Sequence, residues 1–442
     1  MDLKALEQAP ARDDYLFGRG AAWFAMAMTL ALMIFDYVDR QVIVSLFPYL
    51  KAEWNLSDKQ LGALVSVVSI TVGLGALPIA LFADRVSRVK SIVVMAALWS
   101  MATISCMWTR SYGALLSARA MVGLGEAGYG SVGGALIATH FPARLRGAVL
   151  AAFFASASVG SVLGVMLGGV IAAKWGWQAA FGVVGIPGLL LALLYLKVRD
   201  YHTVKLEPAL DSKRRSLRES GLHIVRALTR APTMLWVCIG GSAQLIVVSA
   251  LWSWLPSFLN RVHGVAPAQA GVKAALVVLA GAVGSVVWGA VVDRAGVRHA
   301  RRKLVALALL CLLAMAVLVP AFALVHDPAL QFALIVFGGF VATCTVGPVA
   351  AIVIDVVHPG VRATGASVLA LFQNLFGLAA GPFIAGMLSD AWGLVPALTA
   401  TPLFALVAAG AFMLAARRYE ADKARANEPL VEHPVPSAAQ PA

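Results

Sequence analysis

Charged residues are scarce in this sequence. Asp, Glu, Lys and Arg make up 13% of the 442 residues, whereas hydrophobic residues make up 60%. A typical soluble globular protein has about twice that charged share, and the mean hydropathy here is +0.83. A soluble domain of this composition could not cover its surface with polar groups. The scarcity of charge therefore excludes a soluble protein and predicts one that crosses a membrane several times.

Cysteine, histidine and phosphate-binding motifs are also sparse or missing. The four cysteines stand singly in separate apolar segments, which favours buried free thiols over a disulfide framework, a zinc site or haem attachment. The eight histidines lie in loops or near the ends of apolar segments, so they offer no general base at membrane depth. No Walker-type loop is present, which disfavours an ATP-driven pump. We therefore expect no metal, no cofactor and no enzymatic activity.

Apolar segments long enough to cross a bilayer recur along the whole chain. A bilayer core needs about 20 apolar residues per helix. Twelve segments meet this requirement, at 21–47, 60–83, 90–109, 112–139, 147–173, 177–197, 233–259, 267–292, 303–325, 329–356, 362–388 and 394–416. They predict an all-α membrane protein with twelve transmembrane helices in two pseudo-symmetric six-helix bundles.

The basic residues are distributed unevenly between the two sides of the predicted membrane. With the N-terminus inside, most of the 35 Lys and Arg fall in cytoplasmic segments. The outer segments carry only Lys51, Lys59, Arg110, Lys174 and Arg261. Positive charge gathers on the cytoplasmic side of membrane proteins, so we expect both termini in the cytoplasm and the chain in the cell membrane (the inner membrane of a bacterium). The net charge of +13 is then a topology signal that requires no nucleic acid.

One long loop, 198–232, separates the first six spans from the last six. Its apolar Leu217, Ile224, Val225 and Leu228 share one helical face beside arginines, which predicts a helix lying on the membrane surface. Residues 1–20 lack the pattern of a signal peptide, so we expect the first span to stay uncleaved. The predicted organisation is a cytoplasmic segment 1–20, a bundle 21–197, the linker 198–232, a bundle 233–417 and a disordered tail 418–442.

Two motifs occur once in each half of the chain. "ALFADRVSRVK" (80–90) follows the second span, and "GAVVDRAGVRHARRK" (289–303) follows the eighth. "FPARLRGAVLAAF" (141–153) and "HPGVRATGASVLALF" (358–372) open the fifth and eleventh spans in the same way. Two homologous halves are the layout expected of a secondary transporter.

The first pair of motifs supplies candidate conformational latches. A carboxylate at the end of a span can cap the positive N-terminal end of a neighbouring helix, and such a contact can form in only one conformation. The candidate latch residues are Asp84, Arg85, Arg88, Asp293 and Arg294.

These loop motifs resemble the signature of the major facilitator superfamily. "DRQVIVSLFPYLKAEWNLSDKQLGAL" (39–64), "RAMVGLGEAGYGS" (119–131) and "ALWSWLPSFLNRVHG" (250–264) resemble its spinster-like branch. The resemblance covers nearly the whole chain and implies a transporter; some eukaryotic spinster-like proteins move lysosphingolipids or lysophospholipids. The anion–cation symporter branch of organic-acid carriers shares the Asp-Arg of span 1 and the Gly-Glu-Ala of span 4. Asp36 departs from both, since these families often have Asn there.

Spans 1 and 4 contain five ionisable residues at membrane depth: Asp36, Asp39, Arg40, Arg119 and Glu126. An ionised side chain at the bilayer centre costs at least about 2.5 kcal/mol. Asp36 and Arg40 share one helix face at i, i+4. At about 1.5 Å per residue, Asp36 and Glu126 fall near the midplane, and Asp39, Arg40 and Arg119 fall at similar depth in the outer half, which predicts an ion-pair network. The functional hypothesis is that Asp39, Glu126 and Asp36 carry coupling protons, with Arg40 and Arg119 as charge partners or ligands of an anionic substrate. The alternative is a static network that joins the two helices.

Several uncharged polar or aromatic residues are candidates for a central cavity. Each of them could equally form interhelical hydrogen bonds, and Trp252 could belong to an interfacial aromatic belt. The candidates are Tyr129, Gln244, Ser249, Trp252, Gln373 and Asn374.

The sequence therefore predicts a monomeric, proton-coupled secondary transporter in the lipid bilayer that moves an amphipathic or anionic small molecule, lysolipid-like, by alternating access. An organic-acid/proton symporter of the anion–cation symporter branch is the alternative. A receptor that binds without transport and a membrane-embedded enzyme are further alternatives, which the duplicated halves and the placement of the histidines disfavour.

Overall fold

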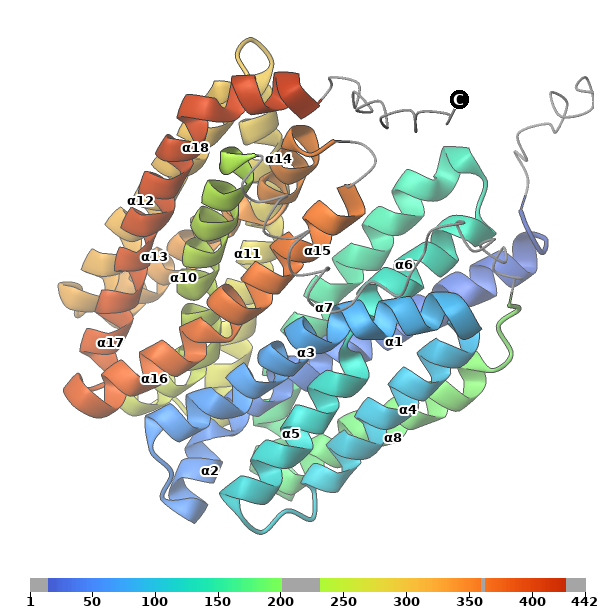
Figure 1. Cartoon of the computed structure of the whole chain (residues 1–442). Coiled ribbons are helices and arrows are strands. Elements are labelled where there is room, and N and C mark those ends of the chain that lie inside the picture. Colours follow the sequence, from blue (N-terminus) through green and yellow to red (C-terminus); the bar gives the residue numbers. More distant parts are fainter. Residues whose placement is uncertain (1–14, 201–230, 359–361, 427–442) are drawn as a thin grey trace, which may run out of the picture.

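Two helical bundles, one from each half of the chain, make up the molecule (Figure 1). The computed structural model describes residues 15–200, 231–358 and 362–426, and within these ranges every regular element is a helix. The predicted surface helix in 198–232 lies almost wholly outside the described residues. The first bundle consists of α1 (Arg19–Val42), η2 (Ile43–Leu46), α2 (Phe47–Trp54), α3 (Asp58–Val86), α4 (Arg88–Cys106), α5 (Tyr112–Glu126), α6 (Tyr129–His140), α7 (Ala143–Trp175) and α8 (Trp177–Tyr195).

The second bundle repeats this arrangement. Its elements are α10 (Pro232–His263), α11 (Pro267–Gly296), α12 (Arg301–Ala323), α13 (Pro328–Ala342), η3 (Thr343–Thr345), α14 (Pro348–Val356), α15 (Arg362–Phe372), η5 (Gln373–Leu378), α16 (Ala380–Trp392), α17 (Leu394–Ala400), η6 (Thr401–Leu403) and α18 (Phe404–Ala426). We call the end where α1 begins and α18 ends the terminal end, and the opposite end the far end.

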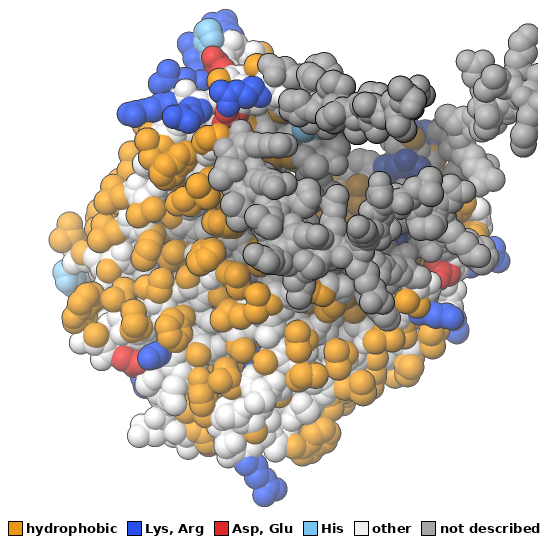
Figure 2. All heavy atoms as spheres, in the orientation of Figure 1, with side chains coloured by type: hydrophobic (Ala, Val, Ile, Leu, Met, Phe, Trp, Pro, Cys, Tyr) orange, Lys and Arg blue, Asp and Glu red, His pale blue; other side chains and the backbone are white. Residues whose placement is uncertain are grey.

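The described helices account for the twelve predicted spans. Eleven of them, some formed by consecutive elements, are long and apolar enough to cross a membrane. The remaining span is divided between α5 and α6, each of which is too short to cross alone. Hydrophobic side chains are spread widely over the coloured part of the lateral surface, and several Lys and Arg gather at its upper left end (Figure 2). The chain is therefore a multi-pass membrane protein.

Several spans predicted as continuous helices are interrupted near their middle. Between α5 and α6 the chain leaves the helix at Ala127 and Gly128, and Gly128 has a φ of 87°, which a residue with a Cβ rarely adopts. A short 3-10 turn, η3, separates α13 from α14 in the second bundle. Another turn of π-helix, η5, interrupts the span that contains Gln373 and Asn374. Such breaks are tolerated at membrane depth where protein covers the freed backbone groups.

Three glycines let α7 approach the first span closely. A Cβ on Gly160, Gly164 or Gly168 would lie 2.4–2.6 Å from a backbone carbonyl oxygen of Ile34, Val38 or Val42, respectively. Only a residue without a side chain fits at these positions, so the spacing of four residues brings the two backbones together. This contact holds α1 directly against α7.

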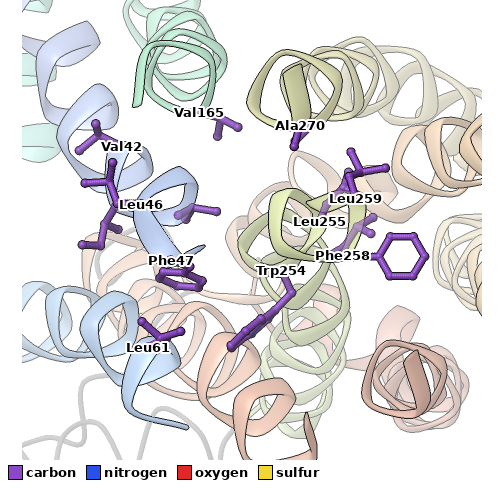
Figure 3. Close-up of a cluster of buried hydrophobic side chains, with 14 of the residues drawn as sticks. Val42, Leu46, Phe47, Leu61, Val165, Trp254, Leu255, Phe258, Leu259 and Ala270 are labelled. Carbon is purple, nitrogen blue, oxygen red and sulfur yellow. The ribbon is translucent and has the colours of Figure 1, made fainter. Parts of the chain in front are cut away.

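The two bundles are joined through α7 with α11 and through α3 with α16. Figure 3 shows the apolar side chains that fill the junction near the far end, with Phe47 of α2 facing Trp254 of α10. The centroids of these two rings are 5.2 Å apart. Val165 of α7 and Ala270 of α11 lie on another side of the same cluster. The bundles are therefore in close apolar contact at the far end.

The predicted disordered tail begins too early. Helix α18 continues to Ala426, nine residues beyond the predicted boundary at 417. Tyr419 and Asp422 lie on one face of this extension and are buried. The Tyr419 hydroxyl donates to Asp355 at 2.7 Å, and the Asp422 carboxylate accepts the Thr233 backbone N–H at 3.0 Å. These partners come from distant segments, so hydropathy along the chain could not show that the helix continues.

Candidate functional site

The predicted ionisable residues of spans 1 and 4 are brought together inside the first bundle. Arg119 of α5 donates from Nη1 to the Asp39 carboxylate of α1 at 2.9 Å. The same nitrogen lies 3.3 Å from the Asp39 backbone oxygen. Both side chains are buried, with 0% of Arg119 and 1% of Asp39 exposed. Thr103 of α4 donates a hydrogen bond to the second Asp39 carboxylate oxygen. We call Asp39 and Arg119 the inner pair.

A second group lies on the neighbouring turn of α1. Arg40 places its Nε 3.1 Å from the Asp36 carboxylate and 3.0 Å from the Glu126 carboxylate. Its guanidinium also lies over the Tyr37 ring, 5.2 Å from the centroid. The Arg40 side chain is 17% exposed, whereas Glu126 is 0% exposed. Among the five charged residues, Arg40 is thus the one that reaches accessible space.

The five residues do not balance in charge. Asp36, Asp39 and Glu126 supply three carboxylates, and Arg40 and Arg119 supply two guanidiniums. Burying an uncompensated charge costs several kcal/mol, and one added proton would remove the net charge of the cluster. The arrangement can therefore hold one proton, which is the chemical property that a proton carrier needs.

Glu126 is the carboxylate least committed to hydrogen bonds. Its Oε2 atom is close to Arg40 Nε but not aligned for a hydrogen bond, and Oε1 has no partner among the described residues. By contrast, each Asp39 oxygen accepts a hydrogen bond, from Arg119 or from Thr103. A neutral Glu126 would lose fewer interactions than a neutral Asp39. The geometry thus favours Glu126 over Asp39 as the place for the proton.

Backbone features at the end of α5 position Glu126 against the neighbouring helices. Glu126 is the last residue of α5, next to the break at Gly128. A Cβ on Gly125 would lie 2.6 Å from the Trp99 backbone nitrogen of α4, and one on Gly123 would lie 2.6 Å from the Val68 oxygen of α3. These two glycines let α5 fit closely against its neighbours. The "GLGEAG" string therefore serves packing as well as charge.

The predicted ion-pair network is confirmed, and the structure adds one member. The Asp36–Arg40 pair has the i, i+4 spacing read from the sequence, and both guanidiniums bridge spans 1 and 4 as predicted. Thr103 was not predicted. Thr103 is one of several hydroxyl residues in the span 90–109, so the sequence did not single it out, and threonine often bonds only to its own helix, as Thr103 also does with the Trp99 oxygen at 2.9 Å.

Three of the cavity candidates are engaged in packing within a bundle. Tyr129 is 0% exposed, packs between Trp99 and Phe153, and donates to the Thr29 backbone oxygen at 2.8 Å. Gln244 is also 0% exposed and donates to the Ala342 oxygen at 2.9 Å. Ser249 donates to the Gly377 oxygen at 3.1 Å. Interhelical hydrogen bonding explains these three residues, so the structure does not bring them to a cavity.

The other cavity candidates lie near the breaks of the second bundle. Gln373 and Asn374 are the first residues of η5 and are partly buried. Trp252 of α10 is partly buried, and its Nε1 is buried with no hydrogen-bond partner among the described residues. A donor without a partner in the protein is available to a ligand, so Trp252 remains a candidate. Asn374 donates to the Ala370 oxygen of its own helix at 2.9 Å.

The latch candidates are only partly described. The side chains of Asp84 and Arg85 lie outside the described set, and Arg88 is the partly buried first residue of α4. Asp293 lies 3.0 Å from Lys303 of its own bundle, is 63% exposed, and is followed by the exposed Arg294. In this structure the described Asp293 contact therefore stays within one bundle.

We predict that the inner pair contributes to stability as a unit. Asp39→Asn would leave the buried Arg119 guanidinium without its ion-pair partner and should lower the free energy of unfolding by about 3–5 kcal/mol. Arg119→Met should have a similar effect, and the double variant should recover most of the loss. Denaturation in detergent micelles measures this double-mutant cycle. The exposed Asp293–Lys303 pair is the control, with an expected coupling of about 0–1 kcal/mol. Equal coupling in the two cycles would contradict the account.

Comparison with known proteins identifies the family. The model of the Major Facilitator Superfamily matches residues 29–380 and 238–439. An "MFS-type efflux pump" of Mycolicibacterium smegmatis is 28% identical over 84% of this chain and 86% of that protein. "Protein spinster homolog 3" of Homo sapiens is 26% identical over 93% of this chain and 86% of that protein. The "Probable L-galactonate transporter" of Escherichia coli is 25% identical over 61% of each chain.

A solved structure has the same fold. The inward-facing, unoccupied crystal structure of a bacterial homolog to the human lysosomal transporter Spinster superposes with a TM-score of 0.80 at 24% identity. The superposition covers 92% of this chain and 99% of that one. The chain belongs to the Major Facilitator Superfamily and is a spinster-like transporter, not an enzyme.

Proposed function

We propose that this transporter is driven by protons and moves an amphipathic anion, lysolipid-like, by alternating access. The single observation that carries the proposal is the buried cluster of three carboxylates and two guanidiniums, which is neutral only with one proton. The free energy of such a buried site depends on whether it is protonated. It therefore depends on the proton concentration on the side of the membrane to which the site is open.

Protonation of Glu126 would change which anions pair with Arg40. With Glu126 ionised, Arg40 lies between that carboxylate at 3.0 Å and Asp36 at 3.1 Å. With Glu126 protonated, one of these two anions is neutral, and the guanidinium has capacity for an external anion. Because Arg40 is also the accessible member of the cluster, an anionic substrate headgroup and the proton would bind together or exchange at this residue.

We place the terminal end in the cytoplasm and the far end outside, in the cell membrane. The distribution of Lys and Arg along the sequence supports this orientation. The chain would act as a monomer, because one copy by itself supplies both bundles. Asp84, Arg85, Arg88, Asp293 and Arg294 remain proposed latches at the cytoplasmic side.

The proposed substrate class rests on two features. Arg40 is a cation that can bind an anionic headgroup, and the surrounding spans are largely apolar. Similarity to spinster proteins supports a lipid-like molecule. An organic-acid/proton symporter is the second candidate, supported by the similarity to the probable L-galactonate transporter. An acid without an apolar tail would use Arg40 but gain little from the apolar surroundings.

Glu126→Gln should abolish transport driven by a pH gradient, because glutamine cannot exchange a proton. Exchange of labelled substrate across proteoliposomes at equal pH should continue, because alternating access itself needs no net proton movement. Glu420→Gln, at an exposed position of α18, is the matched control and should leave both activities unchanged. If Glu126→Gln retains gradient-driven transport with its pH dependence, proton coupling at this residue is excluded.

Arg40→Gln should separate the two substrate classes. We expect an anionic lysolipid to raise the melting temperature of the wild-type protein by a few degrees, as binding to the native state requires. The shift should disappear in Arg40→Gln and remain in Arg110→Gln, an exposed arginine far from the cluster. A panel of lysolipids, sphingoid bases and organic acids provides the measurement. A shift with organic acids alone would reject the lysolipid proposal in favour of the symporter.

A further inference from the structure

A second group of charged residues joins the two bundles at the far end. Asp58, the first residue of α3, is 3% exposed. Its carboxylate accepts hydrogen bonds from Arg261 of α10 at 2.7 Å and from Ser389 of α16 at 2.6 Å. Lys51 of α2, in its own bundle, lies 2.5 Å away. A carboxylate of the first bundle is thus held by two donors from the second.

Asp390 of α16 makes the reciprocal contact. Its two carboxylate oxygens accept the backbone N–H groups of Asp58 and Lys59 at 2.7 and 2.8 Å. These N–H groups are at the first turn of α3, where no intrahelical acceptor exists for them. A negative charge at this position also interacts favourably with the helix dipole. The second bundle therefore caps a helix of the first.

Close backbone packing surrounds this group. A Cβ on Gly386 would lie 2.4 Å from the Asp58 backbone oxygen, and one on Gly62 would lie 2.3 Å from the Pro382 oxygen. Trp254 donates to the same Pro382 oxygen at 3.0 Å and packs on Phe47 in the apolar junction of Figure 3. The charged contacts therefore lie beside closely packed backbone, and hydrogen bonds to ionised groups are stronger than those between neutral groups.

We propose that Asp58 and Asp390 form a reversible clamp that holds the far end closed. The clamp comprises Asp58, Asp390, Arg261 and Ser389, and it must break when the bundles separate at that end. Lys51 belongs to the same bundle as Asp58 and stays beside it, so the carboxylate keeps a counter-charge when the clamp opens. Arg261 keeps its contact with the Trp254 ring, whose centroid is 5.8 Å away.

The clamp acts on the helix that also carries the proposed cytoplasmic latch. Asp58 is the first residue of α3, and Asp84 lies near its end at Val86. Closing the far end through Asp58 and closing the terminal end through Asp84 would therefore be opposing contacts at the two ends of one helix. The strength of the clamp sets the balance between the two conformations. This inference rests on the alternating access of the proposed function, but not on its substrate or its proton.

Distance measurements between spin labels test the clamp. Labels at Gly113→Cys in α5 and Ala329→Cys in α13 report the separation of the bundles at the far end, since both positions are exposed there. The four native cysteines are buried, and a sample without introduced cysteines measures their background labelling. We expect Asp58→Asn and Asp390→Asn each to raise the ratio of open to closed molecules about tenfold or more, because each removes charged hydrogen bonds present only in the closed form.

Asp327→Asn is the matched control. Asp327 also lies at the far end and caps a helix, because it accepts the Leu330 N–H of α13 at 2.7 Å. Both residues belong to the second bundle, so this cap does not join the two bundles. Its substitution should leave the distances unchanged. Unchanged distances in both clamp variants, or an equal change in Asp327→Asn, would overturn the proposal. The readout needs neither substrate nor a pH gradient, so its failure is distinct from failure of the proton-coupling or substrate experiments.

Discussion

The cost of placing charge inside an apolar bundle is the constraint on which the rest of this structure depends. An unpaired buried charge is expensive, and removal of one partner from a buried pair is strongly destabilising. Asp39 and Arg119, with Asp36, Arg40 and Glu126 beside them, must therefore lie within contact distance in any stable form of the first bundle. This requirement fixes the register of α1 against α5, since each guanidinium joins these two helices.

The surrounding helices are built to satisfy that requirement. The glycines of α7 let α1 approach, and Gly123 and Gly125 let α5 sit against α3 and α4. Thr103 of α4 satisfies the Asp39 oxygen that Arg119 leaves free. The break after Glu126 ends α5 at the residue whose carboxylate has the fewest hydrogen-bond partners. Hydrogen bonds thus hold the inner pair, whereas Glu126 has none within the described part of the chain and Arg40 is partly exposed, and at these two residues we propose that the proton and the anion act.

Sequence predicted the features that depend on local pattern. The length of the apolar segments predicted the spans. The charged residues of spans 1 and 4 predicted the ion-pair network, because charged residues at membrane depth have few possible partners. The break at Gly128, the clamp at Asp58 and the extension of α18 were not predicted. Asp58 follows an ordinary helix cap, and its partners lie more than 200 positions away, at Arg261, Ser389 and Asp390. The two roles considered for Tyr129 could not be separated for a related reason, since a tyrosine in an apolar span has the same local pattern whether it lines a cavity or fills a core.

The central claim is that the five-residue cluster holds one proton in the form described here. Infrared difference spectroscopy measures it most directly, because a protonated carboxyl group absorbs apart from a carboxylate. At neutral pH the account predicts one protonated buried carboxyl in the wild-type protein, whose band is absent in Glu126→Gln. A wild-type spectrum with no protonated carboxyl band, or a band that persists unchanged in Glu126→Gln, would contradict it.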